Sequence, residues 1–280
     1  MSAAAFSVLL PVYHRDDPGH LRRAVRSVTT DQTMAPSELL VVQDGPVGDE
    51  LEVALTDVER APGLRVRRVT LPENVGLARA LEVGLSECAH DIVARMDADD
   101  ISLPRRFELQ VPHVVDGMDL VGSAIQEFED DETRAGVVRV PPLDAASIQR
   151  AARIRSPFNH PSVVYRRQAV AAAGGYEDLP LLEDYWLFAR MLDEGARSMN
   201  VPEPLLLYRV GEGAYARRGG RAVLRSEIEL QRRLRQIRFT SRSQALRNVA
   251  VRGAYRLVPE PARRRLYRAL LLGGRPGPVS

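Results

Sequence analysis

Short apolar runs alternate with amphipathic segments along the first hundred residues. The first run is followed by Asp17 and Pro18, which suit an N-cap and a first helical position, and by Leu21, Ala24 and Val28 at helical spacing. The predicted elements, in chain order, are a strand at 6–12, a helix from residue 17, a strand at 38–43, a helix at 49–60, a strand at 64–71, a helix at 75–88 and a strand at 91–96. Strands separated by helices predict parallel pairing with right-handed crossovers.

The pattern becomes less regular in the second half of the chain. We expect the following elements: a helix at 104–115, strands at 120–128 and 137–140, helices at 145–153, 168–173 and 182–194, and helices at 222–237, 241–258 and 259–272. A polar turn at 129–133 favours a mixed sheet from there on, and residues 211–220 form a predicted mobile loop. The expected fold class is therefore α/β, with a mixed, mostly parallel, Rossmann-like sheet flanked by helices.

Composition fits a soluble globular protein. The 280 residues are 45% hydrophobic and 27% charged, which suffices for one substantial core. A single cysteine, Cys88, excludes an internal disulfide framework. The start Met1–Ala5 lacks the positive region of a secretory signal, and no apolar run approaches the roughly 18 residues of a spanning helix. We expect a cytoplasmic location.

Charge is distributed unevenly. Residues 217–275 hold 17 arginines and three acids, a net charge of +14, which leaves −12 on the rest of the chain. A basic helical extension on an acidic body predicts an anionic partner, for which a phospholipid surface or a lipid diphosphate is favoured over nucleic acid. Between residues 257 and 271, leucines interleave with arginines as in a helix lying on the inner face of a cell membrane. A solvated helix packed on the body explains this pattern equally well.

The densest candidate chemistry lies at Asp97, Asp99 and Asp100, directly after the apolar run 92–96. A buried strand ending there places these carboxylates at the carboxyl edge of the sheet, where open α/β folds bind ligands. Mg²⁺ and Mn²⁺ take such oxygen ligands and complete their shells with phosphate and water. An acidic turn before a helix that begins near Ser102 is the simpler alternative.

Five motifs together resemble the family 2 inverting glycosyltransferases of GT-A fold. In chain order they lie at 6–13 (FSVLLPVY), 40–45 (LVVQDG), 74–81 (NVGLARAL), 95–100 (RMDADD) and 182–186 (LEDYW). The resemblance covers residues 5 to 210. The segment 207–210 and the pair Arg217-Arg218 look most like bacterial enzymes of exopolysaccharide and capsule assembly, the amylovoran-type group. The resemblance implies a catalytic domain at 1–212, with a nucleotide-binding half at about 1–100 and an acceptor-side half at about 101–212, followed by a loop and an Arg-rich helical region at 213–280.

The resemblance also implies roles at the nucleotide. The implied nucleotide-binding residues are Pro11, Tyr13, Asp44, Asn74, Gly76, Arg79 and Asp97. Tyr13 would stack on the base, and Asp44 would accept a base N–H, which favours uracil. The helix N-terminus at Asn74 and Gly76 would face the nucleotide together with Arg79, with Asn74 as a simple helix cap remaining open. A surface aromatic and a turn aspartate remain the alternatives for Tyr13 and Asp44.

At the reacting centre, Asp99 with Asp97 would hold Mn²⁺ or Mg²⁺ on the donor diphosphate. Asp184 is the implied base that takes the proton of the acceptor hydroxyl. The implied donor- and acceptor-sugar residues are Glu183, Trp186 and His160. For Trp186 the alternative is core filling, and for Glu183 with Asp184 it is favourable charge at a helix start.

Two family features are missing. Many relatives carry a metal-binding histidine soon after the Tyr-Arg pair, where this chain has the segment 210–213 (VGEG). Glu212 or water would substitute as a metal ligand, or Arg217 and Arg218 would bind the diphosphate directly. The Gln-x-x-Arg-Trp motif of processive synthases is also absent, which favours transfer of one sugar.

The leading interpretation is transfer from a nucleotide sugar, most plausibly a UDP-sugar, to a glycan or polyprenyl-diphosphate-linked acceptor. A non-catalytic nucleotide-sugar-binding relative is the alternative that Asp184→Asn would test. A sugar nucleotidyltransferase needs a Gly-rich phosphate loop after its first strand, and residues 11–16 (PVYHRD) do not resemble one.

Overall fold

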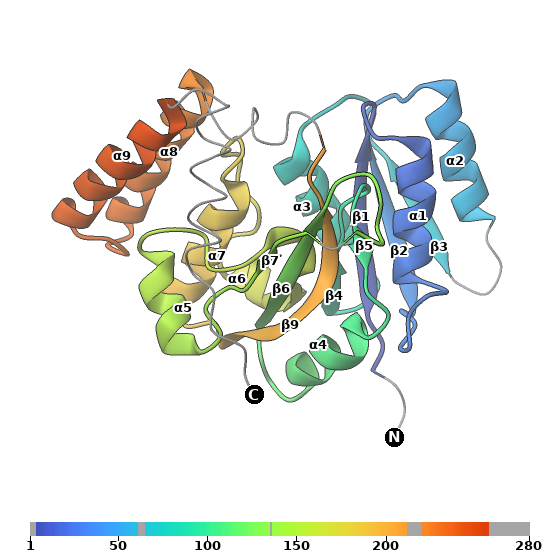
Figure 1. Cartoon of the computed structure of the whole chain (residues 1–280), viewed down its shortest axis with the longest axis horizontal. Helices are drawn as coiled ribbons and strands as arrows, with labels where there is room; N and C mark the ends of the chain where they lie inside the picture. The colour runs from blue at the N-terminus through green and yellow to red at the C-terminus, as the bar shows by residue number, and fades with distance from the viewer. Residues whose placement is uncertain (1–3, 61–64, 135, 212–219, 258–280) are drawn as a thin grey trace.

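The structure is a computed structural model that describes residues 4–60, 65–134, 136–211 and 220–257 (Figure 1). Its strands are β1 Ser7–Tyr13, β2 Glu38–Asp44, β3 Val66–Thr70, β4 Ile92–Arg95, β5 Ile101–Ser102, β6 Leu120–Phe128, β7 Val138–Arg139, β8 Val164–Arg166 and β9 Ser198–Arg209. Its helices are α1 Pro18–Val28, α2 Asp49–Glu59, α3 Leu77–Glu87, α4 Arg106–Val115, α5 Ala145–Ala152, the 3₁₀ turn η1 His160–Ser162, α6 Arg167–Ala172, α7 Glu183–Asp193, α8 Arg221–Gln236 and α9 Arg242–Leu257.

The strands of the described residues form one mixed sheet in the order β3-β2-β1-β4-β8-β6-β9-β5, with β7 added beside β6. The half built from β1 to β4 is parallel, as the alternation of strands and helices predicts. β8 then runs antiparallel to both β4 and β6. β9 pairs in parallel with β6, and β5 pairs antiparallel with β9. The sheet is thus parallel on the side of the first motifs and mixed beyond them.

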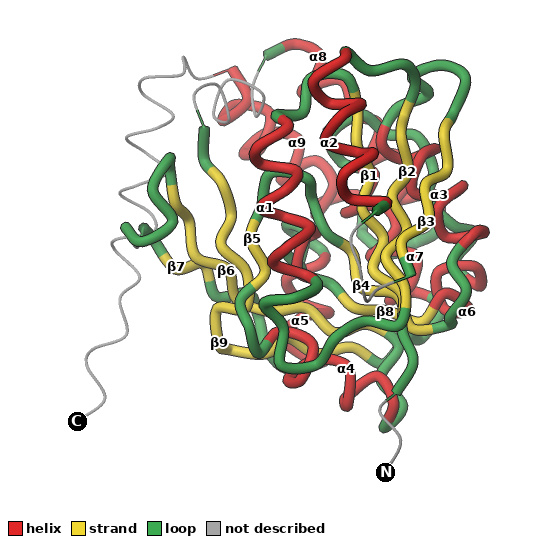
Figure 2. Tube along the Cα trace, turned by 90° about the vertical axis from the view of Figure 1, so that its right-hand side faces the viewer, coloured by secondary structure: helices red, strands yellow, loops and turns green. Residues whose placement is uncertain are grey.

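Helices cover both faces of this sheet (Figure 2). Along β1 the side chains alternate between the faces: Val8 and Leu10 pack with α1, α2 and α4, whereas Leu9 packs with α3 and α7. The N-cap Asp17 accepts the amide of His20 at 2.9 Å and starts α1 as the sequence predicts. The two cores hold the sheet rigid, so the strand ends are fixed points for side chains.

The sequence missed three strands. β5 and β8 are two and three residues long, too short for a periodic signal. β9 contains Pro202 and Pro204, and its pairing with β6 shifts register beside Ala124, so only its apolar end resembled a strand. Ser102 lies in β5, and α4 begins later, after Arg105.

At the C-terminal end, α8 and α9 confirm two of the three predicted helices. The predicted helix 259–272, most of the predicted amphipathic segment and most of the predicted loop 211–220 lie outside the described residues. Among the helices that the structure describes, none is both long enough and apolar enough to cross a membrane.

Candidate active site

Three carboxylates gather just beyond the end of β4. Asp97, Asp99 and Asp100 can each present an oxygen within 4.8 Å of the others. Asp100 is 1% exposed, and its Oδ1 accepts the backbone amide of Arg209 at 2.8 Å. The Arg209 side chain also donates through Nε to the carbonyl oxygen of Asp99 at 2.9 Å. β9 therefore fixes the acidic turn from the side, 109 residues further along the chain.

The crowding of these acids shows in their pKa values. Burial, and then the negative charge of Asp97, raise the pKa of Asp99 to about 6. Burial with the charges of Asp99 and Asp97 raises the pKa of Asp100 well above its ordinary value. Asp16 lies in the loop after β1. Burial, together with the charges of Asp99 and Asp97, raises its pKa to about 7, although the hydrogen bond from the Tyr13 amide lowers it. The negative charges of Asp97 and Asp99 thus disfavour ionisation of the acids that surround them.

This donor set fits a hard divalent cation. The available ligand atoms are carboxylate oxygens, the type that Mg²⁺ and Mn²⁺ take. Oδ2 of Asp100 is buried and has no hydrogen-bond partner within the described ranges. A buried acceptor left unpaired costs free energy, and so does each like-charge contact beside it. A bound cation would relieve both.

Arg95, the last residue of β4, lies beneath the acids. Its side chain is 2% exposed, and Nη2 lies 2.5 Å from Oδ1 of Asp97. Nε and Nη1 are buried without a hydrogen-bond partner among the described residues. Arg95 is not among the predicted site residues, although an arginine inside a buried apolar run, two residues before an aspartate, is itself a signal.

The second acidic pair begins α7. Burial, followed by the charge of Asp184, raises the pKa of Glu183 to about 7. Burial also raises the pKa of Asp184, whereas the Tyr185 amide and the charge of Arg95 lower it. The charge of Arg95 lowers the pKa of both carboxyls, and the charge of Asp97 raises it. The predicted base and the acidic cluster therefore lie within electrostatic reach of one another. Leu181, just before this helix, holds a left-handed φ of 67°, a strained conformation for a leucine.

His160 and Trp186 lie inside the fold. His160 is 8% exposed, and its Nε2 is 2.7 Å from the hydroxyl of Tyr176. Burial and the nearby charge of Arg95 lower the pKa of His160 well below its ordinary value, so the imidazole is neutral. Trp186 donates from Nε1 to Glu177 at 2.9 Å, and the guanidinium of Arg190 lies 4.9 Å from its ring centroid. Trp186 is 5% exposed, which corresponds to the core-filling alternative that the sequence left open.

On the nucleotide side, Asp44 ends β2 and organises the start of α3. Its carboxylate accepts the amide of Val75 at 2.7 Å, the amide of Gly76 at 3.0 Å and the side-chain amide of Asn74 at 3.0 Å. The N-cap of α3 is Gly76, with φ of 88°, rather than Asn74. Asp44 thus acts on the loop that precedes the helix, which is a role the sequence analysis did not foresee.

The remaining predicted residues are spread around this edge. Pro11 is buried within β1, and Tyr13 ends that strand with 39% exposure and its ring 5.4 Å from that of His14. Arg79 is exposed on the first turn of α3. Arg217, Arg218 and Glu212 lie outside the described residues.

Comparison with known proteins decides the family. The profile of glycosyl transferase family 2 matches residues 7–174. The chain belongs to glycosyl transferase family 2. It is 34% identical, over 94% of its length and 97% of the relative, to an amylovoran biosynthesis glycosyltransferase of Erwinia amylovora. It is 33% identical, over 95% of its length and 96% of the relative, to a UDP-Gal:alpha-D-GlcNAc-diphosphoundecaprenol beta-1,3-galactosyltransferase of Escherichia coli. The predicted family is confirmed, and so is the predicted resemblance to amylovoran-type enzymes.

Solved structures show the same architecture. A mannosyltransferase of Pyrobaculum calidifontis, in complex with GDP-Man and Mn²⁺, superposes with a TM-score of 0.62 at 18% identity, over 98% of this chain and 76% of that one. Residues 1–349 of TarS from S. aureus give a TM-score of 0.64 at 15% identity, over 95% and 79%. At such low identity the likeness establishes the fold alone. This family 2 enzyme has the GT-A fold that its sequence predicts, a mixed α/β sheet flanked by helices and followed by C-terminal helices.

Proposed function

We propose that this chain is an inverting, metal-dependent glycosyltransferase that moves one sugar from a UDP-sugar onto a glycan acceptor carried by a polyprenyl diphosphate. The observation that carries the proposal is that two acidic groups, the cluster after β4 and the pair that begins α7, lie within electrostatic reach of one another and of Arg95. One group suits the leaving diphosphate and its cation, and the other suits the incoming hydroxyl.

Asp184 is the base in this proposal. A single displacement at the anomeric carbon needs a carboxylate that takes the acceptor proton as the new bond forms. Burial raises the pKa of Asp184, which strengthens it as a base, while the charge of Arg95 favours its ionised form. Glu183, with a pKa of about 7, shares this environment and would position the sugar or Asp184 itself.

Asp99 and Asp97 would hold Mn²⁺ or Mg²⁺, with Asp100 supporting the turn that carries them. When bound, the cation would neutralise charge that develops on the departing nucleoside diphosphate. Arg209 is fixed against this turn by its hydrogen bonds to Asp99 and Asp100. These bonds keep the turn that carries the carboxylates in place.

The donor side rests on Tyr13 and on the loop that Asp44 organises. A ring with 39% exposure at the end of β1 is available to stack on a base, and amides at the start of a helix favour anionic groups. UDP is proposed as the leaving group because the galactosyltransferase relative uses a UDP-sugar by its name, and TarS has been solved with UDP-GlcNAc. The same relative's name, with its diphosphoundecaprenol acceptor, supports a lipid-linked acceptor here.

The proposal is tested by incubating the full chain with Mn²⁺, a panel of UDP- and GDP-sugars and a polyprenyl-diphosphate-linked sugar acceptor. Release of UDP, one added sugar in the product and inversion at the anomeric carbon by NMR are the expected results. Asp184→Asn should lower kcat by roughly 10²–10⁴-fold. The matched control is Asp193→Asn, an exposed aspartate at the far end of the same helix, which should leave kcat unchanged.

Retention of configuration, or full activity in a chelator, would contradict the mechanism. If the chain is instead a non-catalytic nucleotide-sugar-binding relative, UDP-sugars should raise its thermal midpoint, but no combination of donor and acceptor should give turnover. A nucleotidyltransferase would instead release pyrophosphate from UTP and a sugar phosphate. These readouts separate the three functions.

A further inference from the structure

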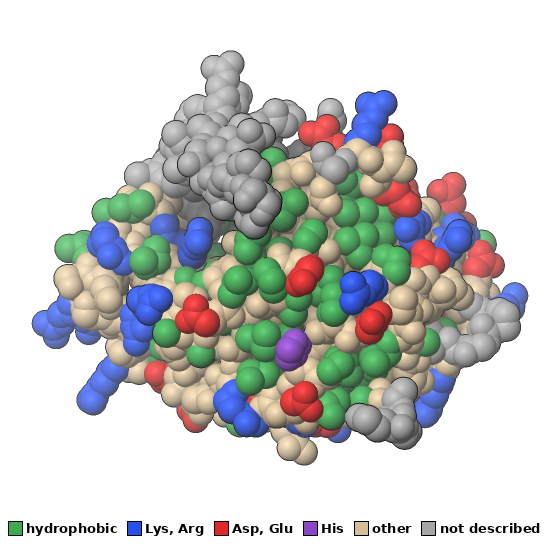
Figure 3. Space-filling view, turned by 60° about the horizontal axis from the view of Figure 1, so that its bottom comes forward, with side chains coloured by type: hydrophobic (Ala, Val, Ile, Leu, Met, Phe, Trp, Pro, Cys, Tyr) green, Lys and Arg blue, Asp and Glu red, His purple; other side chains and the backbone are tan. Residues whose placement is uncertain are grey.

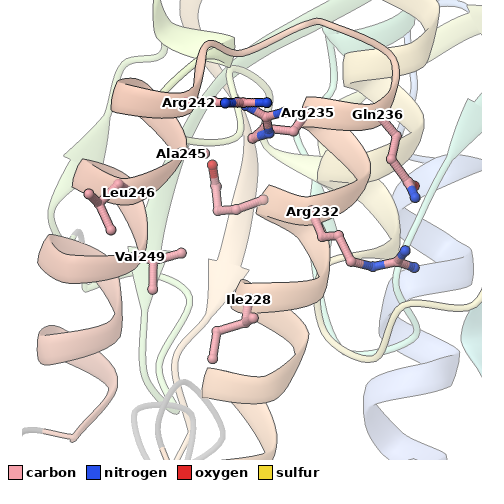
Figure 4. Close-up of a pocket in the computed structure, with 9 residues that line it drawn as sticks. Ile228, Arg232, Arg235, Gln236, Arg242, Ala245, Leu246 and Val249 are labelled. Carbon is pink, nitrogen blue, oxygen red and sulfur yellow. The ribbon is translucent and has the colours of Figure 1, made fainter.

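A groove of about 600 Å³ lies between α8 and α9, at the end of the molecule away from α2 (Figures 1 and 4). Ile228 and Val249 project between the two helices, and Leu246 lines the outer side of α9 (Figure 4). Arg235 and Arg242 approach one another at one end of the groove, near the turn that joins the helices (Figure 4). The groove therefore combines an apolar floor with a cationic end.

The apolar floor is open to solvent. Leu246 is 73% exposed and Ile228 is 48% exposed, whereas Leu230 and Leu234 on the inner face of α8 are fully buried. Single exposed leucines are common on protein surfaces. Here, however, the exposed apolar side chains come from two adjacent helices and line one hollow, which is typical of an interaction surface.

Some arginines of α8 and α9 form ion pairs and others do not, and Arg232, which lines the groove, is paired with Glu229. On the inner side, Arg233 lies 3.2 Å from Glu177, and Arg252 lies 2.7 Å from the buried Glu227. These pairs fasten the helices to each other and to the catalytic body. On the outer side, Arg235 and Arg242 make no ion pair with any residue that the structure describes. Their charge is left for a ligand.

We propose that the α8–α9 groove docks on an anionic phospholipid bilayer, with Arg235 and Arg242 at the lipid phosphates and Ile228, Leu246 and Val249 against the acyl region. A lipid suits both halves of the groove, because one molecule presents a phosphate and a hydrocarbon chain. Residues 220–257 hold ten arginines and two glutamates, which suits a surface of negative charge. Blue side chains also gather at this end in Figure 3, whereas the two signs mix over the rest of that face.

The groove is linked to the candidate active site through α7. α8 packs on α7, and Arg233 of α8 reaches Glu177, which in turn accepts the indole N–H of Trp186 in α7. Glu183 and Asp184 start that same α7 helix. The docking site does not depend on the proposed chemistry, since none of its residues belongs to the acidic groups. If both hold, a lipid-linked acceptor would meet the site at the membrane surface.

The test is flotation of the full chain with vesicles of phosphatidylcholine alone and with vesicles of equal parts phosphatidylcholine and phosphatidylglycerol. The expected result is binding to the anionic vesicles only, weakened by salt. The double variant Arg235→Gln/Arg242→Gln should bind about tenfold or more weakly, from the usual contribution of a basic residue near an anionic surface. Leu246→Ser should weaken binding without changing its salt dependence.

The matched control is Arg60→Gln/Arg65→Gln, which removes the same charge from two exposed arginines at the opposite end of the molecule. It should bind vesicles as the natural chain does. Thermal melts and UDP release in solution should be unchanged in all variants. Equal loss in the control, or binding unaffected by the groove variants, would overturn the proposal. So would a stable dimer in light scattering that the Leu246→Ser variant dissolves, since a second copy would then be the occupant.

Discussion

Nη2 of Arg95 lies 2.5 Å from Oδ1 of Asp97, in a position where the arginine is almost wholly buried. This pair joins the last residue of a core strand to the first carboxylate of the site. A buried charge without its partner costs free energy, so removing one member of the pair should destabilise the fold.

We expect Arg95→Met to lower the free energy of unfolding by about 3–5 kcal/mol, since it removes the buried counter-charge of Asp97. Adding Asp97→Asn should recover part of this loss. A double-mutant cycle from urea melts measures the coupling between the two residues. Additive losses in the cycle would show that the two side chains do not support one another.

A divalent cation should stabilise the fold through the acidic cluster. Mn²⁺ should raise the thermal midpoint, because it relieves the repulsion among Asp16, Asp97, Asp99 and Asp100. Asp99→Asn should remove most of that increase, and the control Asp193→Asn should keep it. An unchanged response in Asp99→Asn would place the cation elsewhere.

The pH profile of kcat/KM should rise with pH and level off once the base is ionised. The pKa values of Glu183 and Asp184 are both raised, so a base in this pair is protonated, and inactive, at acidic pH and becomes active as pH rises through its pKa. Glu183→Gln should move the midpoint of the profile downward, because the neighbouring negative charge is gone. A profile that falls with rising pH over this range would rule out a carboxylate base here.

Gly45→Ala should disrupt the donor side. Gly45 has φ of 86°, and a Cβ there would lie 2.5 Å from the backbone nitrogen of Asn74. The change should cost about 1–3 kcal/mol of stability and weaken UDP binding, as measured by calorimetry. The control is Gly48→Ala, where no atom lies within 4 Å of the added carbon and the expected cost is under about 1 kcal/mol. Equal effects of the two changes would mean that the loop around Asn74 yields easily.

Tyr176→Phe should leave the ring nitrogen of His160 without its 2.7 Å partner in the core. The expected loss is about 1–3 kcal/mol in the free energy of unfolding. A second change, His160→Phe, should then cost less in the Tyr176→Phe background than alone. Full additivity would indicate that the hydrogen bond contributes little.

The sequence predicted the parallel half of the fold well because helical and strand periods alternate there, with an N-cap at Asp17 and apolar runs of strand length. It predicted the acidic cluster and the acids of α7 because charges stand directly beside buried elements. It could not predict that β9 lies between β6 and β5, since strand order depends on tertiary packing and Pro202 and Pro204 obscure the pattern. The roles of Asp16 and Arg209 also depend on contacts between segments that are far apart in the chain, so the sequence did not predict them.

The hydrogen bond from Arg209 to Asp100 spans 109 residues of chain. Closing so long a loop costs conformational entropy, which slows folding. In addition, β9 must enter the sheet between β6 and β5, which both precede it in the chain. A nascent chain that ends after α7 already contains every acid of the site, but it lacks β9, the strand that holds the acidic turn in place. The acidic turn should therefore be held in place only after β9 has been made and has joined the sheet.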